Sequence, residues 1–282
     1  MPPPTATTRV AAVIGSPVRH SLSPVLHNAA FTETGLDWVY LAFEVPPGAV
    51  PDAFAGVRAL GLAGLSVTTP HKEAAAEACD RLSADAEALG AVNCVVNDGG
   101  TLVGHSTDGD GFVAALAAEV DLAPGGRRCV VLGAGGAARS IALALARAGA
   151  AEVAVVNRTP ARAERTVALV GPTGRVVGPD DVPPTVEAAE LVVNATSLGM
   201  GASATRGESP LDPGLLHAGT VVADIVYDPV ATPLLEAARA AGARTLNGLP
   251  MLVHQAAIAF EHWTGREAPV EVMSAAVADA RA

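Results

Sequence analysis

Short apolar runs alternate with alanine-rich stretches along most of the chain. An apolar run of about four to eight residues between turn residues is typical of a buried strand, whereas an alanine-rich stretch favours a helix. The alternation predicts an α/β fold in which βα units surround mostly parallel sheets. In the first part of the chain, strands are expected at residues 10–14 and 65–68.

A second series of apolar runs occupies the middle of the chain. Each run is almost continuously apolar, as expected for a strand of a parallel sheet that helices cover on both faces. Helices are expected at 111–120, which would connect the two halves, and at 251–263. The strands of this series are expected at 128–132, 153–156, 191–193 and 221–225.

Size and charge narrow the class of protein. The 282 residues are 50% hydrophobic, which suits one large or two medium domains. The formal net charge of −11 disfavours nucleic acid and anionic membranes as partners, because both attract basic surfaces. The first eight residues hold no apolar signal core, and no stretch reaches the roughly 18 apolar residues of a membrane span. We expect a cytoplasmic protein whose partner is a small molecule.

A metal site is not expected. Cys79, Cys94 and Cys129 are far apart and lack the spacing of metal ligands, so they are predicted to be buried thiols. The segment that begins at Asp108 resembles a calcium loop in spacing only. Phe112 and Val113 stand where such a loop needs an acidic or amide residue and a glycine.

One residue count changes the picture. Of eighteen Lys and Arg residues, only Lys72 is a lysine. It is expected at a helix start, where a cation is unfavourable unless an acid lies nearby. Arginine does not release a proton at working pH, whereas a desolvated lysine can, so Lys72 is a candidate acid/base. A solvated surface lysine is the alternative.

A glycine-rich turn follows the expected strand at 128–132 and precedes a helical stretch at 139–147. This order is typical of a dinucleotide site, where glycines let the backbone approach a pyrophosphate that binds the helix N-terminus. A plain tight turn is the alternative. The turn consists of Gly133, Ala134, Gly135, Gly136, Ala137 and Ala138.

The end of the next strand indicates which dinucleotide. NAD enzymes usually carry an acid there for the ribose hydroxyl, but this chain has Asn157, Arg158 and Thr159, with Arg162 one turn later. Guanidinium groups suit a 2′-phosphate, so NADP is predicted. Two solvated arginines at a helix start are the alternative.

Two serines follow the first expected strand. Ser23 precedes Pro24, which is the pattern of a helix N-cap with proline at the first helical position. That explanation leaves Ser21 unexplained, and two hydroxyls so close together could bind a carboxylate or a polyol. Asp108 has a similar second explanation, as the cap of the helix that follows it.

Nine short motifs in order along the chain resemble the shikimate dehydrogenase family, also called the shikimate/quinate dehydrogenases. The resemblance extends from Gly15 to Gly265. The motifs are Ser-x-Ser-Pro, Val-Thr-x-Pro-His-Lys, Gly-Ala-Val-Asn, Thr-Asp-Gly, Gly-Ala-Gly-Gly-Ala-Ala, Asn-Arg-Thr, Asn-Ala-Thr-Ser-x-Gly-Met, Asp-Ile-Val-Tyr-x-Pro and Asn-Gly-x-x-Met-Leu-x-x-Gln.

The resemblance implies two domains and a reaction. An α/β substrate-binding catalytic domain would span 1–108 and be completed by C-terminal helices at 248–282. A Rossmann-type NADP-binding domain would be inserted at 109–247. The implied activity is the reversible, NADP-dependent reduction of 3-dehydroshikimate to shikimate, in the shikimate pathway of aromatic amino acid biosynthesis. A homodimer is compatible with the sequence.

The resemblance also implies the residues of the site. Lys72 and Asp108 would act on the reacting hydroxyl. The substrate would be bound by Ser21, Ser23, Thr68, Asn93, Tyr227 and Gln255. The cofactor would be bound by Gly133, Ala134, Gly135, Gly136, Ala137, Asn157, Arg158, Thr159, Arg162, Thr196, Ser197, Ile225, Gly248 and Met251.

Two residues depart from the family pattern and leave alternatives open. Ser66 and Ser106 stand where the family usually has asparagine, so a contact made there would be weaker or bridged by water. A catabolic quinate/shikimate dehydrogenase is one alternative, although Asn157 and Arg158 disfavour the NAD that it would use. A non-catalytic sensor of NADP and a ligand is another, since fold does not fix function. A tetrahydrofolate-type dehydrogenase of the same architecture has no support from the Ser-x-Ser-Pro and Thr-Asp-Gly motifs.

Overall fold

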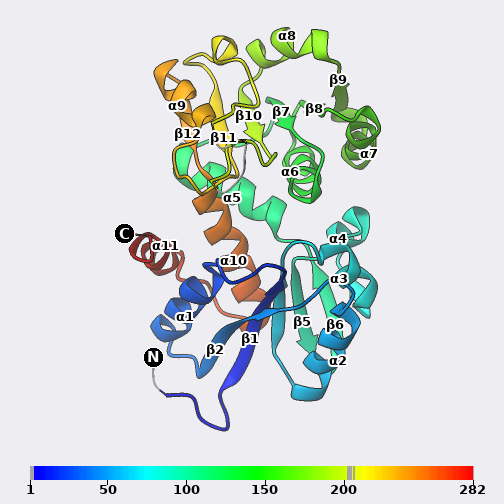
Figure 1. The fold of residues 1–282 in the computed structure, drawn as a ribbon, viewed down its shortest axis with the longest axis vertical. Coiled ribbons are helices and arrows are strands. Elements are labelled where there is room, and N and C mark those ends of the chain that lie inside the picture. Colours follow the sequence, from blue (N-terminus) through cyan, green and yellow to red (C-terminus); the bar gives the residue numbers. More distant parts are fainter. Residues whose placement is uncertain (1–2, 202–204, 206, 282) are drawn as a thin grey trace. The chain divides into compact units, whose positions relative to one another are not determined.

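The structure is a computed structural model that describes residues 3–201, 205 and 207–281, drawn as a ribbon in Figure 1. The chain divides into two compact units. The first runs to Thr107 and resumes at Val253, and the second spans Asp108–Leu252. Each unit has its own six-stranded sheet with helices, so the predicted α/β class is confirmed.

The sheet of the first unit has the strand order β2-β1-β3-β5-β6-β4. The strands expected at 10–14 and 65–68 are present as β1 and β3, and they pair in parallel. Only β5 runs antiparallel to its neighbours in this sheet. The strands are β1 Arg9–Gly15, β2 Trp38–Glu44, β3 Gly64–Val67, β4 Arg81–Leu82, β5 Cys94–Asp98 and β6 Thr101–His105.

Helices cover both faces of this sheet. On one face, apolar residues of α2, α3 and α4 pack against the sheet in one core cluster. On the other face, aromatic rings of α1 and α10 lie against β2, and the Trp263 indole donates to the Val95 carbonyl at 2.9 Å. The helices are α1 Ser23–Glu33, α2 Val50–Leu60, α3 Lys72–Ala78, α4 Ala84–Leu89, α11 Val270–Asp279 and the part of α10 Gly248–Thr264 from Val253 onwards.

The sheet of the second unit has the order β12-β11-β10-β7-β8-β9, and all its pairs are parallel. Its first strand lies at the centre and the order reverses between β7 and β10, which is the doubly wound Rossmann topology. All four strands expected here are present. The strands are β7 Arg128–Leu132, β8 Glu152–Val156, β9 Gly174–Val177, β10 Leu191–Asn194, β11 Val221–Asp224 and β12 Arg244–Leu246.

Two layers of helices cover this sheet. Residues of α5, α6 and α7 share a core cluster with one face, and residues of α8 and α9 share another with the opposite face. In the part of the chain that the structure describes, no helix is both long and apolar enough to cross a membrane. The helices are α5 Asp108–Val120, α6 Gly136–Arg147, α7 Pro160–Val170, α8 Val182–Glu187 and α9 Pro233–Ala240, with short 3-10 turns at Gly171–Thr173, Pro179–Asp181 and Pro213–Leu215.

The cysteines are free thiols in this structure. Cys94 and Cys129 are buried as predicted, whereas Cys79 is only half-buried because it lies at the end of α3. Among the described residues, no group of three or more His, Cys, Asp or Glu side chains could hold a metal ion.

Candidate active site

The serine loop, residues 16–22 between β1 and α1, differs from the N-cap pattern read from the sequence. The N-cap explanation of Ser23, which stood beside a role in substrate binding, is wrong: the helix begins at Ser23, and the capping position falls on Leu22, which already has helical backbone angles and makes no side-chain cap. The Ser21 hydroxyl instead accepts a hydrogen bond from the Ser23 N–H at 3.2 Å. No described residue offers a hydrogen bond to the Ser23 hydroxyl, so this group is available to a ligand.

The loops that follow β1 and β3 lie side by side. The Ser16 N–H donates to the Thr69 carbonyl at 3.1 Å. A Cβ atom at Gly15 would lie 2.5 Å from the Thr68 methyl group, so only glycine lets the half-buried Thr68 side chain cross the end of β1. The serine loop and Thr68 are therefore at the same edge of the sheet.

Lys72 is held at the start of α3 by its neighbours. The His71 ring is buried, and its Nε2 lies 2.7 Å from the Val45 carbonyl oxygen. The Lys72 carbonyl accepts from the Val92 N–H at 2.9 Å. The Lys72 side chain is half-buried. The backbone at Lys72 is thus tied to the segment that leads into Asn93.

Asn93, Thr107 and Gln255 form a hydrogen-bonded clamp. The Asn93 Nδ2 donates to Thr107 Oγ1 at 2.9 Å and to Gln255 Oε1 at 3.3 Å, and Asn93 Oδ1 accepts from the Thr107 N–H at 2.7 Å. The Thr107 hydroxyl donates to the Gln255 carbonyl at 3.0 Å. Asn93 and Thr107 are buried, whereas Gln255 is half-buried. The clamp joins the loop before β5, the residue before Asp108, and α10.

Asp108 directly follows this clamp in the chain. It is the first residue of α5 in the second unit and is 9% exposed. The next residue, Gly109, packs against α6: a Cβ there would lie 2.5 Å from the Ser140 carbonyl oxygen. The backbone around Asp108 is therefore constrained on both sides of the residue.

The glycine turn has the backbone that a pyrophosphate site requires. Gly133 has a φ of +110°, and a Cβ there would lie 2.9 Å from the Ala195 carbonyl oxygen. Gly135 and Gly136 are exposed, and a Cβ at either would meet no atom within 4 Å, so the space beside them is open. The turn leads into α6, a helix of 12 residues whose first N–H groups have no helical partner. The turn and this helix start therefore fit a phosphate-bearing dinucleotide.

The end of β8 presents cationic side chains. Arg158 and Arg162 are exposed, and no described residue forms an ion pair or side-chain hydrogen bond with either guanidinium. The half-buried Asn157 uses its Nδ2 to donate to the Thr159 carbonyl at 2.9 Å, which shapes the start of α7. The two guanidinium groups are thus available to a ribose phosphate.

A buried polar network that the sequence did not single out lies behind Thr196. Asn194 Oδ1 accepts from the Thr196 hydroxyl at 2.7 Å, and Asn194 Nδ2 donates to Asp224 at 2.9 Å. Asp224 also accepts from the Thr232 hydroxyl at 2.7 Å. Burial raises the pKa of Asp224, and these hydrogen bonds offset part of that effect. In the sequence, this network is indicated by a polar residue at the end of each of two apolar strands, Asn194 and Asp224. The network orients Thr196. Ser197 is exposed.

The segment after β11 contacts the start of α10 within the second unit. The Gly248 N–H donates to the Val226 carbonyl at 3.2 Å, and a Cβ at Gly248 would lie 2.1 Å from the Ile225 carbonyl oxygen. Met251 belongs to the core cluster that the sheet shares with α5, α6 and α7, and Ile225 packs against that cluster. Tyr227 is half-buried two residues after Ile225.

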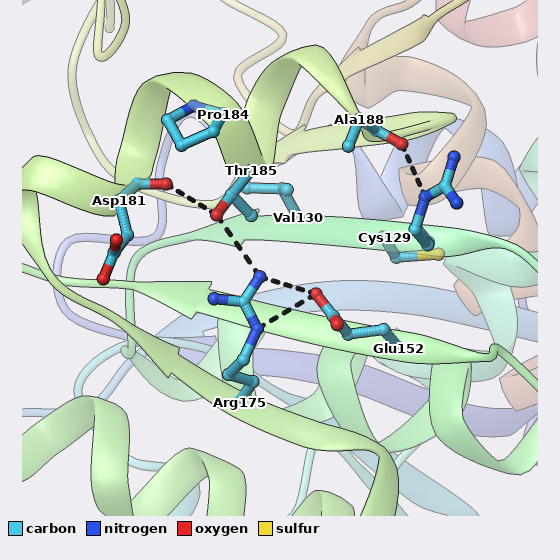
Figure 2. A pocket seen from close by; sticks show the side chains of 9 residues that line it. Cys129, Val130, Glu152, Arg175, Asp181, Pro184, Thr185 and Ala188 are labelled. Carbon is cyan, nitrogen blue, oxygen red and sulfur yellow. Dashed lines mark hydrogen bonds and ion pairs between the residues drawn. The ribbon is translucent and has the colours of Figure 1, made fainter.

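A cavity of about 390 Å³ lies elsewhere in the second unit (Figure 2). It is lined by residues at the amino-terminal ends of β7 and β8, the opposite edge from the glycine turn. Arg175 is paired with Glu152 at 2.7 Å and donates to Thr185 at 3.3 Å, and dashed lines mark both interactions in Figure 2. Because these groups satisfy one another, and because ligands of such sheets bind at the carboxyl ends of strands, this cavity is not the candidate site.

Three family models match successive parts of the chain. Residues 13–95 match the shikimate dehydrogenase substrate binding domain, and residues 116–200 match shikimate / quinate 5-dehydrogenase. Residues 248–278 match the shikimate 5'-dehydrogenase C-terminal domain. These matches cover parts of both units.

Individual proteins are similar over nearly the whole length. The shikimate dehydrogenase (NADP(+)) of Methanopyrus kandleri is 49% identical over 279 residues, which cover 96% of each chain. That of Moorella thermoacetica is 47% identical over 98% of this chain and 94% of its own. The crystal structure of shikimate 5-dehydrogenase from Listeria monocytogenes, in complex with shikimate and NAD, has a TM-score of 0.91 at 39% identity and covers 97% of this chain and 98% of its own.

Proposed function

The chain belongs to the shikimate dehydrogenase family, and from this membership we propose that it catalyses the reversible, NADP-dependent reduction of 3-dehydroshikimate to shikimate. The observation that carries the proposal is the position of Lys72. This lysine begins α3, and its carbonyl is tied to the segment that leads into the Asn93–Thr107–Gln255 clamp.

Lys72 is the proposed acid/base. In the direction of reduction, its ammonium gives a proton to the carbonyl oxygen of the substrate, and in the reverse direction its amine takes that proton back from the hydroxyl. Asp108 is proposed to hydrogen-bond to the same oxygen. The substrate carboxylate and ring hydroxyls are assigned to Ser21, Ser23, Thr68, Asn93, Tyr227 and Gln255.

NADP is the proposed cofactor, and when bound it supplies or accepts the hydride. Its pyrophosphate is assigned to the glycine turn and the start of α6, and its 2′-phosphate to Arg158 and Arg162. Asn157, Thr159, Thr196 and Ser197 line the assigned path, with Ile225, Gly248 and Met251 at the nicotinamide. On this assignment most substrate contacts come from the first unit, Asp108 and Tyr227 belong to the second unit, and the second unit binds NADP.

We also propose a homodimer located in the cytoplasm. The edge strand β2 exposes Leu41 and Phe43, which are 41% and 42% exposed, and two such strands paired across a twofold axis would cover these side chains. Sedimentation of the wild type and of Phe43→Lys tests the assembly. A wild type that sediments as a monomer contradicts the dimer, and membrane-bound protein after cell fractionation contradicts the location.

The test of the activity is Lys72→Ala, with NADP binding measured alongside. We expect turnover to fall at least about 100-fold, because a positioned acid/base contributes that much or more, while the dissociation constant for NADP stays the same. Lys72→Arg is the matched control for charge, since it keeps the cation and cannot release a proton. Turnover of Lys72→Ala within about tenfold of wild type contradicts the role of Lys72.

The substrate is tested with a panel. Shikimate, quinate and an amino analogue of shikimate are assayed side by side with NADP and with NAD. We expect shikimate with NADP to be preferred. A preference of about twofold or less for NADP over NAD favours the quinate/shikimate alternative, and no turnover with any pair favours a sensor.

A further inference from the structure

A row of polar side chains crosses the sheet of the first unit just below Thr68. The strand registers place Ser66 opposite Cys94, and Cys94 opposite His105, so the three side chains share one face. It is the face on which Trp263 lies, because a Cβ at Gly64 would be 2.3 Å from the Trp263 Nε1. Ser66 is half-buried, whereas Cys94 is buried.

Tyr40 reaches this row from β2 and is fixed in place. Its ring is 1% exposed and stacks on His27, with centroids 4.4 Å apart and planes at 23°. Trp263 lies on it at 5.8 Å. The Asn28 amide bonds both backbone groups of Tyr40, accepting from its N–H at 2.8 Å and donating to its carbonyl at 3.0 Å. The phenol oxygen therefore has one position relative to β3.

That phenol oxygen donates to Ser66. The Tyr40 hydroxyl and Ser66 Oγ are 2.7 Å apart. Burial raises the pKa of Tyr40 far above its usual value, so the phenol keeps its proton and acts as the donor at working pH. No described residue accepts a hydrogen bond from the Ser66 hydroxyl. A hydroxyl that accepts one hydrogen bond is polarised and becomes a better donor to the next group.

We propose that Tyr40 is a positioning residue that holds the Ser66 hydroxyl as a hydrogen-bond donor to an oxygen of the bound substrate. This inference rests on the proposed function. It assigns a role to the serine that replaces the family's asparagine: an asparagine brings its own amide donors, whereas the shorter serine depends on Tyr40 for its direction.

The variants Tyr40→Phe and Ser66→Ala test the inference. Tyr40→Phe removes only the phenol oxygen and keeps the ring that packs on His27 and Trp263. We expect each variant to raise KM for shikimate about three- to tenfold, the size of one hydrogen bond, with kcat and the KM for NADP within about twofold of wild type. Ser66→Thr, which keeps the hydroxyl, is expected to leave KM for shikimate close to that of the wild type. Thr264→Val is the matched control, because it removes a half-buried hydroxyl of the same unit that bonds the Phe260 carbonyl.

The double variant separates positioning from a structural effect. If Tyr40 acts through Ser66, Tyr40→Phe adds no further rise in KM to Ser66→Ala. The inference is overturned if Tyr40→Phe raises KM for shikimate as much in the Ser66→Ala background as it does in the wild type. It is also overturned if neither single variant raises this KM. In both cases, turnover by the wild type leaves the proposed function intact. A wild type that does not oxidise shikimate overturns both.

Discussion

Asn93 and Thr107 bond to each other twice: the Asn93 Nδ2 donates to the Thr107 hydroxyl at 2.9 Å, and the Thr107 N–H donates to Asn93 Oδ1 at 2.7 Å. The oxygen and the nitrogen of the Asn93 side-chain amide are therefore both fixed in orientation. The Gln255 side chain shares the same Nδ2 at 3.3 Å. Asn93 and Gln255, which are assigned to the substrate, are thus oriented by Thr107, which is not assigned to it.

Thr107→Val tests this arrangement. Valine has nearly the same shape but removes the hydroxyl, so Asn93 loses an acceptor and the Gln255 carbonyl loses a donor. We expect KM for the substrate to rise about tenfold and the free energy of unfolding to fall by about 1–3 kcal/mol, the cost of buried groups left unpaired. Steady-state kinetics and urea unfolding measure the two effects. Thr107→Ser, which keeps the hydroxyl, is the control, and an unchanged KM in Thr107→Val contradicts the prediction.

Removing the guanidinium groups at the end of β8 tests the choice of cofactor. In Arg158→Ala, we expect KM for NADP to rise about 10- to 100-fold, because a charge-assisted bond to the 2′-phosphate is lost, with KM for NAD nearly unchanged. Adding Arg162→Ala is expected to enlarge the effect. Arg165→Ala removes an exposed cation from the same helix and serves as the control. Equal losses with NADP and NAD count against the assignment.

The central strands were predictable from the sequence because burial on both faces makes them continuously apolar. The expected strand 128–132 coincides with β7. The edge strands β2 and β9 gave a weaker pattern, since their outer residues are exposed. The hairpin of β5 and β6 was missed although it had a local signal: Gly99 and Gly100 form its two-residue loop with positive φ.

The site was predictable in part for similar reasons. Glycine turns and cations at strand ends are local features, so the motifs carry them. Tyr40 and Ser66 meet across 26 positions of sequence, and Asn194 and Asp224 across 30. No spacing rule indicates such pairs, because strand order brings them together. The N-cap explanation of Ser23 failed because the helix begins one residue earlier than the motif predicts: Ser23 is already helical, and the capping position falls on Leu22.

Gly109→Ala is expected to destabilise the second unit. The new methyl group would lie 2.5 Å from the Ser140 carbonyl oxygen and 2.7 Å from the Ala144 Cβ, so α5 would have to move away from α6. We expect a loss of about 1–3 kcal/mol in the free energy of unfolding, and lower kcat because Asp108 precedes this glycine. Gly56→Ala is the control: it is also helical, has nothing within 4 Å, and should stabilise by up to about 1 kcal/mol. Equal effects of both substitutions on the urea midpoint contradict the prediction.

His27 is expected to weaken the fold in acid. It is fully buried on Tyr40, no described residue hydrogen-bonds to either ring nitrogen, and burial lowers its pKa to about 3. An unfolded histidine has a pKa of about 6.5. Between pH 6.5 and 3 the unfolded state therefore binds a proton that the folded state does not. The free energy of unfolding then falls as pH falls, by up to about 1.4 kcal/mol per pH unit, and this histidine has no effect above that window.

His27→Leu removes this contribution. We expect urea midpoints measured from pH 7 to pH 4 to fall less steeply than in wild type, with the two proteins differing most at the acidic end. Part of the slope remains, because burial and the neighbouring His262 lower the pKa of His105 to about 4. His20→Leu, which changes an exposed histidine, should keep the wild-type slope. If the urea midpoints of His27→Leu and of the wild type fall equally with pH, the His27 ring is protonated in the folded protein and the prediction is contradicted.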